Sequence, residues 1–256
     1  MTGLASSARA LLHLWWARTM TPMVVVAIAA LVMLPMVFGA LYSSLYSVRA
    51  GPDADPAMFL VARFDQLVLP LATPIIALLL GTSAFSAEAE DGTLLYLVTT
   101  TTPRWWICAT RVLFASIITA LLSAIAVVGT GLLVNGTEDP MRVTRAFAIA
   151  AAFGGATYAA LFTALSLLVR RALVTGLAYV IFWEGVLSTT FPAIHYLSVR
   201  QWMIAIAGSI TDASTPRLDS GPSVTAAMIG GALVFLLAAV LGARALDRPR
   251  LSRMGT

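Results

Sequence analysis

Six apolar segments, each about as long as a helix that crosses a lipid bilayer, constrain this sequence more than any other feature. A spanning helix takes about 20 mostly apolar residues. The segments lie at 22–42, 66–85, 107–134, 146–169, 172–190 and 223–243. Hydrophobic residues make up 59% of the chain and charged residues only 11%, whereas an average soluble domain has about 25% charged residues. We therefore predict an all-α polytopic membrane protein with six transmembrane helices in a single domain, 1–256.

The arginines indicate the orientation of these helices, because cytoplasmic loops carry an excess of positive charge. The chain has 16 basic residues, all of them arginine. With the N-terminus in the cytoplasm, the residues left outside are Arg49, Arg63, Arg142, Arg145, Arg200 and Arg217. The larger share then lies inside. We predict that both termini are cytoplasmic and that the protein is a multi-pass component of a bacterial inner (cytoplasmic) membrane.

The first 21 residues are expected to form an amphipathic helix along the inner leaflet. One face of this helix would be apolar and the other polar. The apolar positions are Leu4, Ala8, Leu11, Leu12 and Trp15, and the polar ones are Ser6, Arg9 and His13. The segment 1–21 is predicted to be an elbow before the first span, either a simple anchor or part of a coupling device.

Composition argues against nucleic-acid, metal and cofactor sites. The net charge is +4, but the arginines stand singly between apolar runs instead of gathering on one face. Cys108 is the only cysteine, which excludes a two-cysteine metal or redox motif. His13 and His195 fall on opposite sides of the membrane in this topology. We expect no nucleic-acid partner, no metal, and no cofactor bound by this chain.

The cytoplasmic segment 86–104 carries the main functional signal. Glu88, Glu90 and Asp91 crowd a loop where positive charge is expected. Gly92 permits a bend, and Thr102 with Pro103 is a typical N-cap and first-turn pair for the third span. The pattern predicts a bend, a short helix and a capped start of the third span, which together form a rigid projection into the cytoplasm. A connecting hairpin whose acids simply remain in water is the alternative.

A family resemblance favours the first interpretation. The run FSAEAEDGTLLYLVTTTTPRWWICATR, after PLATPIIALLLGTSA, resembles the segment between the second and third spans of ABC transporter permeases of the ABC-2 type. That family shows an E-x-E-x-G-T-L stretch followed by an arginine and a basic residue. The matching positions are Glu88, Glu90, Gly92, Thr93 and Arg104, with Arg111 where a lysine is usual.

The resemblance implies an ATP-driven exporter in which this segment docks into a separate nucleotide-binding subunit. Glu88, Glu90, Asp91, Gly92, Thr93 and Arg104 would be its ATPase-coupling residues. Two permease subunits, identical or homologous, would pair, and two ATPase copies would bind ATP and Mg. The chain has no G-x-x-x-x-G-K-[ST] phosphate loop and no lysine. ATP hydrolysis is therefore expected on another chain, and no catalytic residue is predicted here.

Glu184 is the remaining candidate, because an acid at membrane depth is costly and marks a functional site by default. It lies 12 residues into the fifth span, about 18 Å deep at 1.5 Å per residue. It is expected either to line the substrate pathway or to make a structural hydrogen bond to a neighbouring helix.

Two other segments have competing interpretations. Ala148, Ala152, Ala156, Ala160 and Ala164 form a smooth stripe, which favours close helix packing. The segment 191–222 is apolar at first and polar later, so it is either a re-entrant helical element or an extracellular loop.

Three alternative functions remain open on the sequence. An ABC-type permease could transmit ATP-driven motion to a periplasmic maturation partner. A channel would need a ring of polar pore residues, for which only Glu184 qualifies. An intramembrane hydrolase would need a nucleophile paired with a histidine or an acid at membrane depth, and no G-x-S-x-G elbow is present.

Overall fold

The computed structural model describes residues 16, 19–46, 55–90, 103–134, 138–211 and 222–247, and their regular structure is helical throughout. Among these residues, five helices are long and apolar enough to cross a membrane: Pro22–Leu45, Pro56–Phe85, Arg104–Leu133, Met141–Leu168 and Val224–Ala245. This confirms a multi-pass helical membrane protein. The predicted fifth span contains a shorter apolar helix, Ala172–Leu187.

Two of the long helices in the described residues combine α-helical and π-helical turns. The first consists of α2 (Pro22–Leu41) and η1 (Tyr42–Tyr46). The second is a continuous rod of α4 (Pro56–Arg63), η3 (Phe64–Ala72) and α5 (Thr73–Glu90). The others are α7 (Arg104–Leu133), α8 (Glu138–Leu168) and α12 (Val224–Asp247).

Side-chain caps explain where several helices begin. The Thr21 hydroxyl accepts from the Val24 N–H at 3.5 Å, and the Asp55 carboxylate accepts from the N–H groups of Ala57 and Met58 at 2.9 and 3.1 Å. Each cap satisfies backbone donors that have no partner inside their helix. Proline follows both caps, at the first turn, where its missing N–H costs nothing.

The second helix begins ten residues before the predicted start at residue 66, because its charged residues have partners. The Arg63 guanidinium lies over the rings of Phe38 and Phe59, 5.7 and 5.3 Å from their centroids. Asp65 pairs with Arg200 at 2.9 Å. Charges that argued against a spanning helix are thus compensated within the protein. The fourth helix likewise starts before residue 146, at Glu138.

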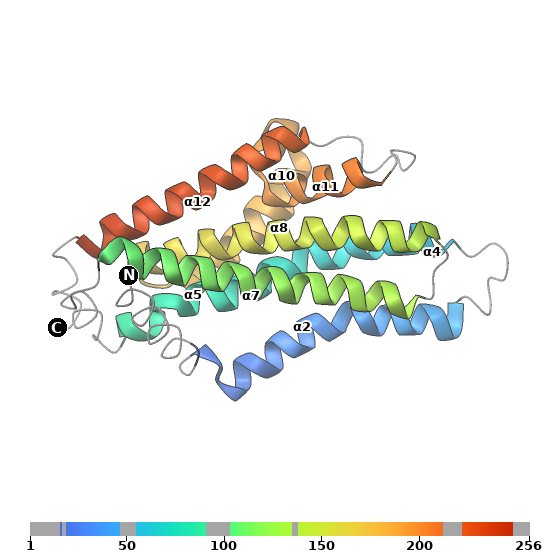
Figure 1. Ribbon diagram of the computed structural model, residues 1–256, viewed down its shortest axis with the longest axis horizontal. Coiled ribbons are helices and arrows are strands. Elements are labelled where there is room, and N and C mark those ends of the chain that lie inside the picture. The colour runs from blue at the N-terminus through green and yellow to red at the C-terminus, as the bar shows by residue number, and fades with distance from the viewer. Residues whose placement is uncertain are drawn as a thin grey trace, which may run out of the picture.

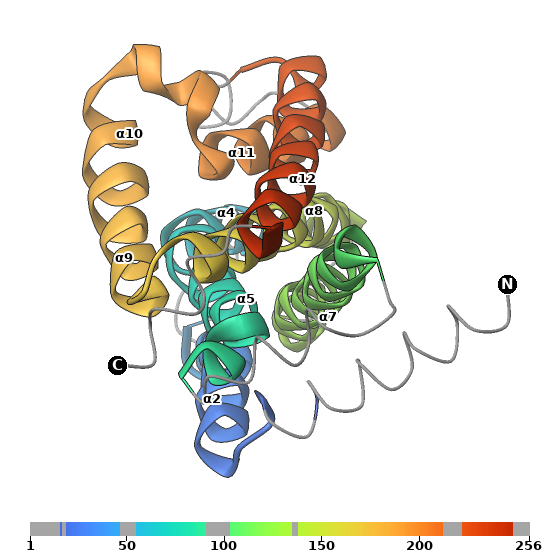
Figure 2. The ribbon, with the colours of Figure 1, turned by 90° about the vertical axis from the view of Figure 1, so that its left-hand side faces the viewer.

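The long helices run along one common axis in alternating directions. The chain enters α2 and leaves α12 at the same end, on the left of Figure 1, which we call the terminal end. Helix α5 ends and α7 begins at this end as well, whereas α4 and α8 begin at the opposite end. Viewed along the axis, α5, α7 and α8 are grouped near the centre, with α2 and α12 on opposite sides (Figure 2).

Helix α8 is the central packing element, in contact with α5, α7, α11 and α12. Small residues allow this approach. A Cβ at Gly81 of α5 would lie 2.8 Å from the Phe162 Cβ and 3.0 Å from the Ala159 carbonyl oxygen, both on α8. On the alanine stripe, the Ala156 carbonyl accepts from the Ser116 hydroxyl of α7 at 3.0 Å. The stripe therefore serves packing, as its spacing predicts.

Between α8 and α12 the chain forms five short elements. They are α9 (Ala172–Ala178), η4 (Tyr179–Leu187), α10 (Ser188–Thr190), the 3₁₀ turn η5 (Pro192–Leu197) and α11 (Val199–Ile210). Of the nine residues from Val199 to Ala207 in α11, all except Arg200 are buried. The segment 191–222, for which a helix and a surface loop were alternatives, thus holds a buried helix.

Several predicted features lie outside the described residues. Most of the elbow 1–21 is among them, although Trp16 makes an edge-to-face contact with Phe114 of α7, with centroids 6.5 Å apart. The predicted Thr102 cap is also outside. Pro103, predicted in the first turn of the third span, instead precedes α7 in an extended conformation.

Candidate functional site

Glu184 is the centre of a buried polar cluster and is 1% exposed. One of its carboxylate oxygens, Oε1, accepts from the Tyr179 hydroxyl at 3.1 Å and from the Val199 backbone N–H at 3.0 Å. The other, Oε2, accepts from the Ser198 hydroxyl in a short hydrogen bond. Three donors therefore compensate a carboxylate that would otherwise be costly among apolar side chains.

Local backbone geometry positions these groups. In a π-helix the backbone hydrogen bonds join residues i and i+5, so Tyr179 and Glu184 lie about one turn apart on η4. The Ser188 hydroxyl donates to the Glu184 carbonyl at 2.7 Å and braces the next turn. The η4 segment therefore turns both the Tyr179 hydroxyl and the Glu184 carboxylate toward the same neighbour, the start of α11.

Ser198 and Val199 are the first residues of that neighbour. Ser198 is the N-cap of α11, and its hydroxyl accepts from the Gln201 N–H at 3.2 Å. Glu184 binds both this cap and the first N–H of the helix. A negative charge at a helix N-terminus is favoured by the helix dipole and by the unpaired N–H groups. Glu184 thus caps a helix that begins 15 residues later in the chain.

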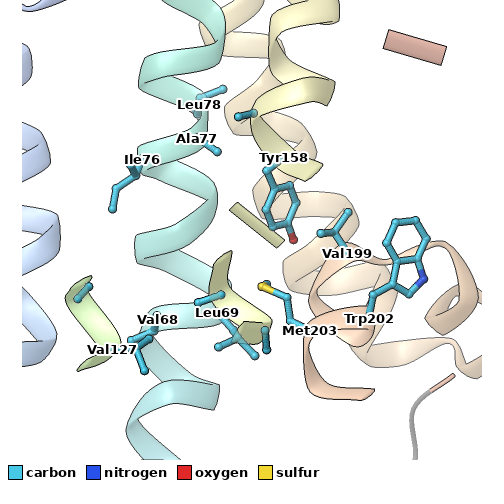
Figure 3. Packing of buried hydrophobic residues seen from close by; sticks show 14 of the residues in the cluster. Val68, Leu69, Ile76, Ala77, Leu78, Val127, Tyr158, Val199, Trp202 and Met203 are labelled. Atoms are coloured by element: carbon cyan, nitrogen blue, oxygen red, sulfur yellow. The ribbon is translucent and has the colours of Figure 1, made fainter. Parts of the chain in front are cut away.

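Tyr158 of α8 forms the floor of the cluster. Its side chain is fully buried, and its ring lies between α5 and Val199 at the start of α11 (Figure 3). The Tyr158 hydroxyl has no hydrogen-bond partner within the described residues. Its ring stacks with Phe162 at 6.0 Å, and Phe162 in turn contacts Tyr179 edge-to-face at 6.1 Å. The contacts among these three rings position η4 against α8.

A second polar contact binds the other side of α11. The Arg200 guanidinium donates to the Asp65 carboxylate at 2.9 Å and to the Asp65 carbonyl at 3.3 Å. Their side chains are 14% and 21% exposed, respectively. The first turn of α11 is therefore attached to two π-helical segments, to η4 through Glu184 and to η3 through Asp65.

Arg111 is a second buried charged group, near the terminal end of the bundle (Figure 1). It lies on α7, is 1% exposed, and donates a hydrogen bond to the Ala84 carbonyl of α5. Its guanidinium also lies over the Phe85 ring, 4.7 Å from the centroid. Arg111 therefore clamps α7 to the last turns of α5, next to the acidic segment.

The predicted coupling residues lie at the ends of these two helices. Glu88 and Glu90 belong to the last turn of α5, and Arg104 is the first residue of α7. Asp91, Gly92 and Thr93 lie outside the described residues. The structure thus brings the two ends of the coupling segment to neighbouring helices at the terminal end (Figure 1).

Glu184 was predicted from the sequence, whereas its partners were not. Tyr179, Ser198, Arg200 and Asp65 gave no recognisable motif, because they come from separate segments of the chain. One signal was available in retrospect: Arg63 and Asp65 stand between an Asp-Pro helix start and a long apolar run. Within the described residues, no three His, Cys, Asp or Glu side chains lie close enough together to hold a metal ion.

Comparison with known proteins gives no further assignment. Neither the known family models nor the curated protein sequences match this chain. Arguments about its function therefore rest on its own residues and on the resemblance of the acidic segment.

Proposed function

We propose that this chain is the transmembrane permease subunit of an ATP-driven exporter of the ABC-2 type. In this proposal the chain pairs with a second permease subunit, identical or homologous, to form the translocation pathway. Two copies of a separate ATPase subunit bind ATP and Mg and dock on the cytoplasmic side. The chain itself carries out no catalysis.

The observation that carries the proposal is the acidic segment held between α5 and α7. Its sequence resembles the coupling element of this family, and its two ends lie on helices that contact each other. Arg111 joins α7 to Ala84 and Phe85, only a few residues before Glu88. Because α5 and α7 are joined at this point, a displacement of the segment by a docked ATPase would move both helices together. If the two helices were not joined, the same displacement could be taken up by the segment alone.

The helix directions support a topology with six crossings. Helices α8 and α12 both run toward the terminal end (Figure 1), so the chain between them must return to the opposite end. The elements α9 to α11 supply this return. Six crossings bring both termini to one side, which is the cytoplasmic side if the ATPase docks between α5 and α7.

A channel receives less support. Its expected pore residue, Glu184, is 1% exposed and accepts three hydrogen bonds from protein groups. A selectivity site instead needs side chains that are free to replace the hydration shell of an ion.

The coupling role is tested by Glu88→Ala, Glu90→Arg and Gly92→Val. We expect each to weaken association with the ATPase, because removing one member of a desolvated charge pair at an interface costs about 2–5 kcal/mol. Gly92→Val acts through the predicted bend, where a β-branched residue is restricted. Membrane insertion and stability in detergent should stay near wild type, since a charge in a water-facing loop, as predicted for these acids, contributes only about 0–1 kcal/mol to folding.

The measurement is ATP hydrolysis and ATPase content in material purified through a tag on this chain. Glu138→Ala, an acid at the start of α8 and the opposite end of the bundle, is the matched control and should behave as wild type. If the wild-type chain purifies with no ATPase, or if all three variants retain normal ATPase content and ATP hydrolysis, the proposal fails.

A further inference from the structure

The segments on either side of Glu184 follow different parts of α8. Gly176 of α9 lies against Phe162, toward the end of α8, because a Cβ there would come within 3.3 Å of the Phe162 ring. Met203 of α11 lies against Gly154, and the Ile210 carbonyl accepts from Arg142 at 3.3 Å, near the start of α8. Helix α9 therefore contacts α8 toward its end, and α11 contacts α8 nearer its start.

Neither segment is long enough to cross a membrane alone. The apolar helix Ala172–Leu187 has 16 residues and α11 has 12. At 1.5 Å per residue these are about 24 and 18 Å, against a hydrocarbon core of about 30 Å. The two lengths together are sufficient, and the sequence of contacts along α8 places them one after the other.

The break between them lies at the polar cluster. The chain leaves η4 through α10 and η5 and re-enters at Ser198, whose hydroxyl and following N–H both bind Glu184. Interrupted helices at membrane depth are tolerated only where protein groups or water satisfy the free backbone groups. Here the carboxylate of the first half satisfies the N-terminus of the second half.

We propose that α9–η4 and α11 are the two halves of one discontinuous membrane crossing, and that Glu184 is the positioning residue that docks α11. Discontinuous helices of this kind border substrate sites in transporters. Resting on the proposed function, Glu184 acts on transport indirectly, because it holds α11 between α8, α12 and η3. Asp65 provides the second attachment through Arg200.

The test measures access to the buried face of α11. Cys108 is the only cysteine, so Cys108→Ala gives a cysteine-free background. Ala207→Cys places a reporter at a position of α11 that is 0% exposed. An impermeant maleimide added to proteoliposomes should label this reporter slowly with Glu184 in place. Neither an ATPase nor a substrate is needed, so the result stands apart from the test of the proposed function.

Glu184→Ala should increase the labelling rate of Ala207→Cys at least about tenfold, because it removes the charge-assisted hydrogen bonds that hold the start of α11. Glu184→Gln should stay near the parent rate. Its amide oxygen can still accept from Val199, and its amide group can donate to the Ser198 hydroxyl. A parent-like labelling rate in Glu184→Gln would show that the hydrogen bonds of residue 184, and not its negative charge, hold the start of α11.

Two further reporters exclude general loosening. Ala150→Cys on α8 is 0% exposed and should remain protected, whereas Arg145→Cys is exposed and should be labelled equally in every background. If Ala207→Cys stays protected in Glu184→Ala, or if Ala150→Cys becomes accessible with it, the assignment is overturned. Should Glu184→Ala fail to accumulate, Ser198→Ala removes one donor and retains the carboxylate, and it must raise the labelling rate of Ala207→Cys above the parent rate for the assignment to stand.

Discussion

At the scale of single residues, the two buried charged groups Glu184 and Arg111 are both stabilised by several contacts within the protein. Glu184 accepts three hydrogen bonds, and Arg111 donates to a backbone carbonyl while stacking on an aromatic ring. Glu184 of η4 binds the start of α11, and Arg111 of α7 binds the last turns of α5. A charge that needs several partners is therefore also a constraint on how those segments sit together.

Arg111→Met should destabilise the bundle, because it keeps an unbranched side chain but removes the guanidinium. The loss combines a charge-assisted hydrogen bond to Ala84, worth about 1.5–3 kcal/mol, with a desolvated cation–π contact to Phe85, worth up to about 2 kcal/mol. We expect a fall of about 2–4 kcal/mol in the free energy of unfolding. Thermal unfolding of the detergent-purified protein, followed by tryptophan fluorescence, measures it.

Arg171→Met is the matched control for this experiment, since Arg171 is exposed in the turn before α9. Its midpoint should shift little, because exposed substitutions usually change stability by less than about 0.5 kcal/mol. Equal midpoints for Arg111→Met and wild type would show that the clamp contributes nothing to the pairing of α5 and α7.

At the scale of elements, the sequence predicts a helix correctly where the length of an apolar run alone decides the structure. The span predicted at 107–134 is observed as α7 (Arg104–Leu133), and the stripe through Ala156 packs as its spacing predicts. The starts of the second and fourth helices were missed because Arg63, Asp65 and Arg142 are charged, and their partners come from distant segments. Helix α11 could not be placed for the same reason: its docking depends on Glu184 and Asp65.

The pairing of α5 with α8 gives a prediction at this scale. Gly81→Ala places a methyl group 2.8 Å from the Phe162 Cβ, 3.0 Å from the Ala159 carbonyl oxygen and 3.1 Å from the Thr163 nitrogen. Most of these atoms belong to the α8 backbone, which cannot move aside as a side chain could. We expect a destabilisation of about 1–3 kcal/mol from overpacking, read from the midpoint of thermal unfolding.

Gly185→Ala supplies the comparison, because its Cβ would meet only the Val180 carbonyl oxygen, at an ordinary 3.6 Å. This variant should unfold within about 0.5 kcal/mol of wild type. If Gly81→Ala were equally harmless, the helices would have to be free to separate, and α8 could not serve as the rigid centre of the bundle.

At the scale of the whole molecule, the outer helices expose long apolar faces. Only 17% of the most apolar window of α2 and of α12 is buried, against 67% for the helix from Pro56 to Phe85. An apolar helix surface of this kind is stable in a lipid environment. The arrangement, with α2 and α12 on opposite sides of α5, α7 and α8 (Figure 2), is that of a membrane domain whose outer helices face lipid or another membrane subunit.

Orientation in the membrane is the last prediction. The native Cys108 is 0% exposed and packs against the Ala238 carbonyl at 3.9 Å, so it is unsuited to labelling. We instead place single cysteines in the Cys108→Ala background at Arg145 and Arg171, which are both exposed and lie near the start and just after the end of α8. Because the excess of arginine favours a cytoplasmic terminal end, an impermeant maleimide added to intact cells should label Arg145→Cys and spare Arg171→Cys.

Permeabilising the cells should then make Arg171→Cys as reactive as Arg145→Cys, which shows that protection came from the membrane and not from burial. The two positions are a matched pair, since both replace an exposed arginine beside the same helix. The opposite labelling pattern would place both termini outside the cytoplasm. A coupling segment between α5 and α7 would then face away from ATP, and the proposed ABC-type function would fall with the orientation.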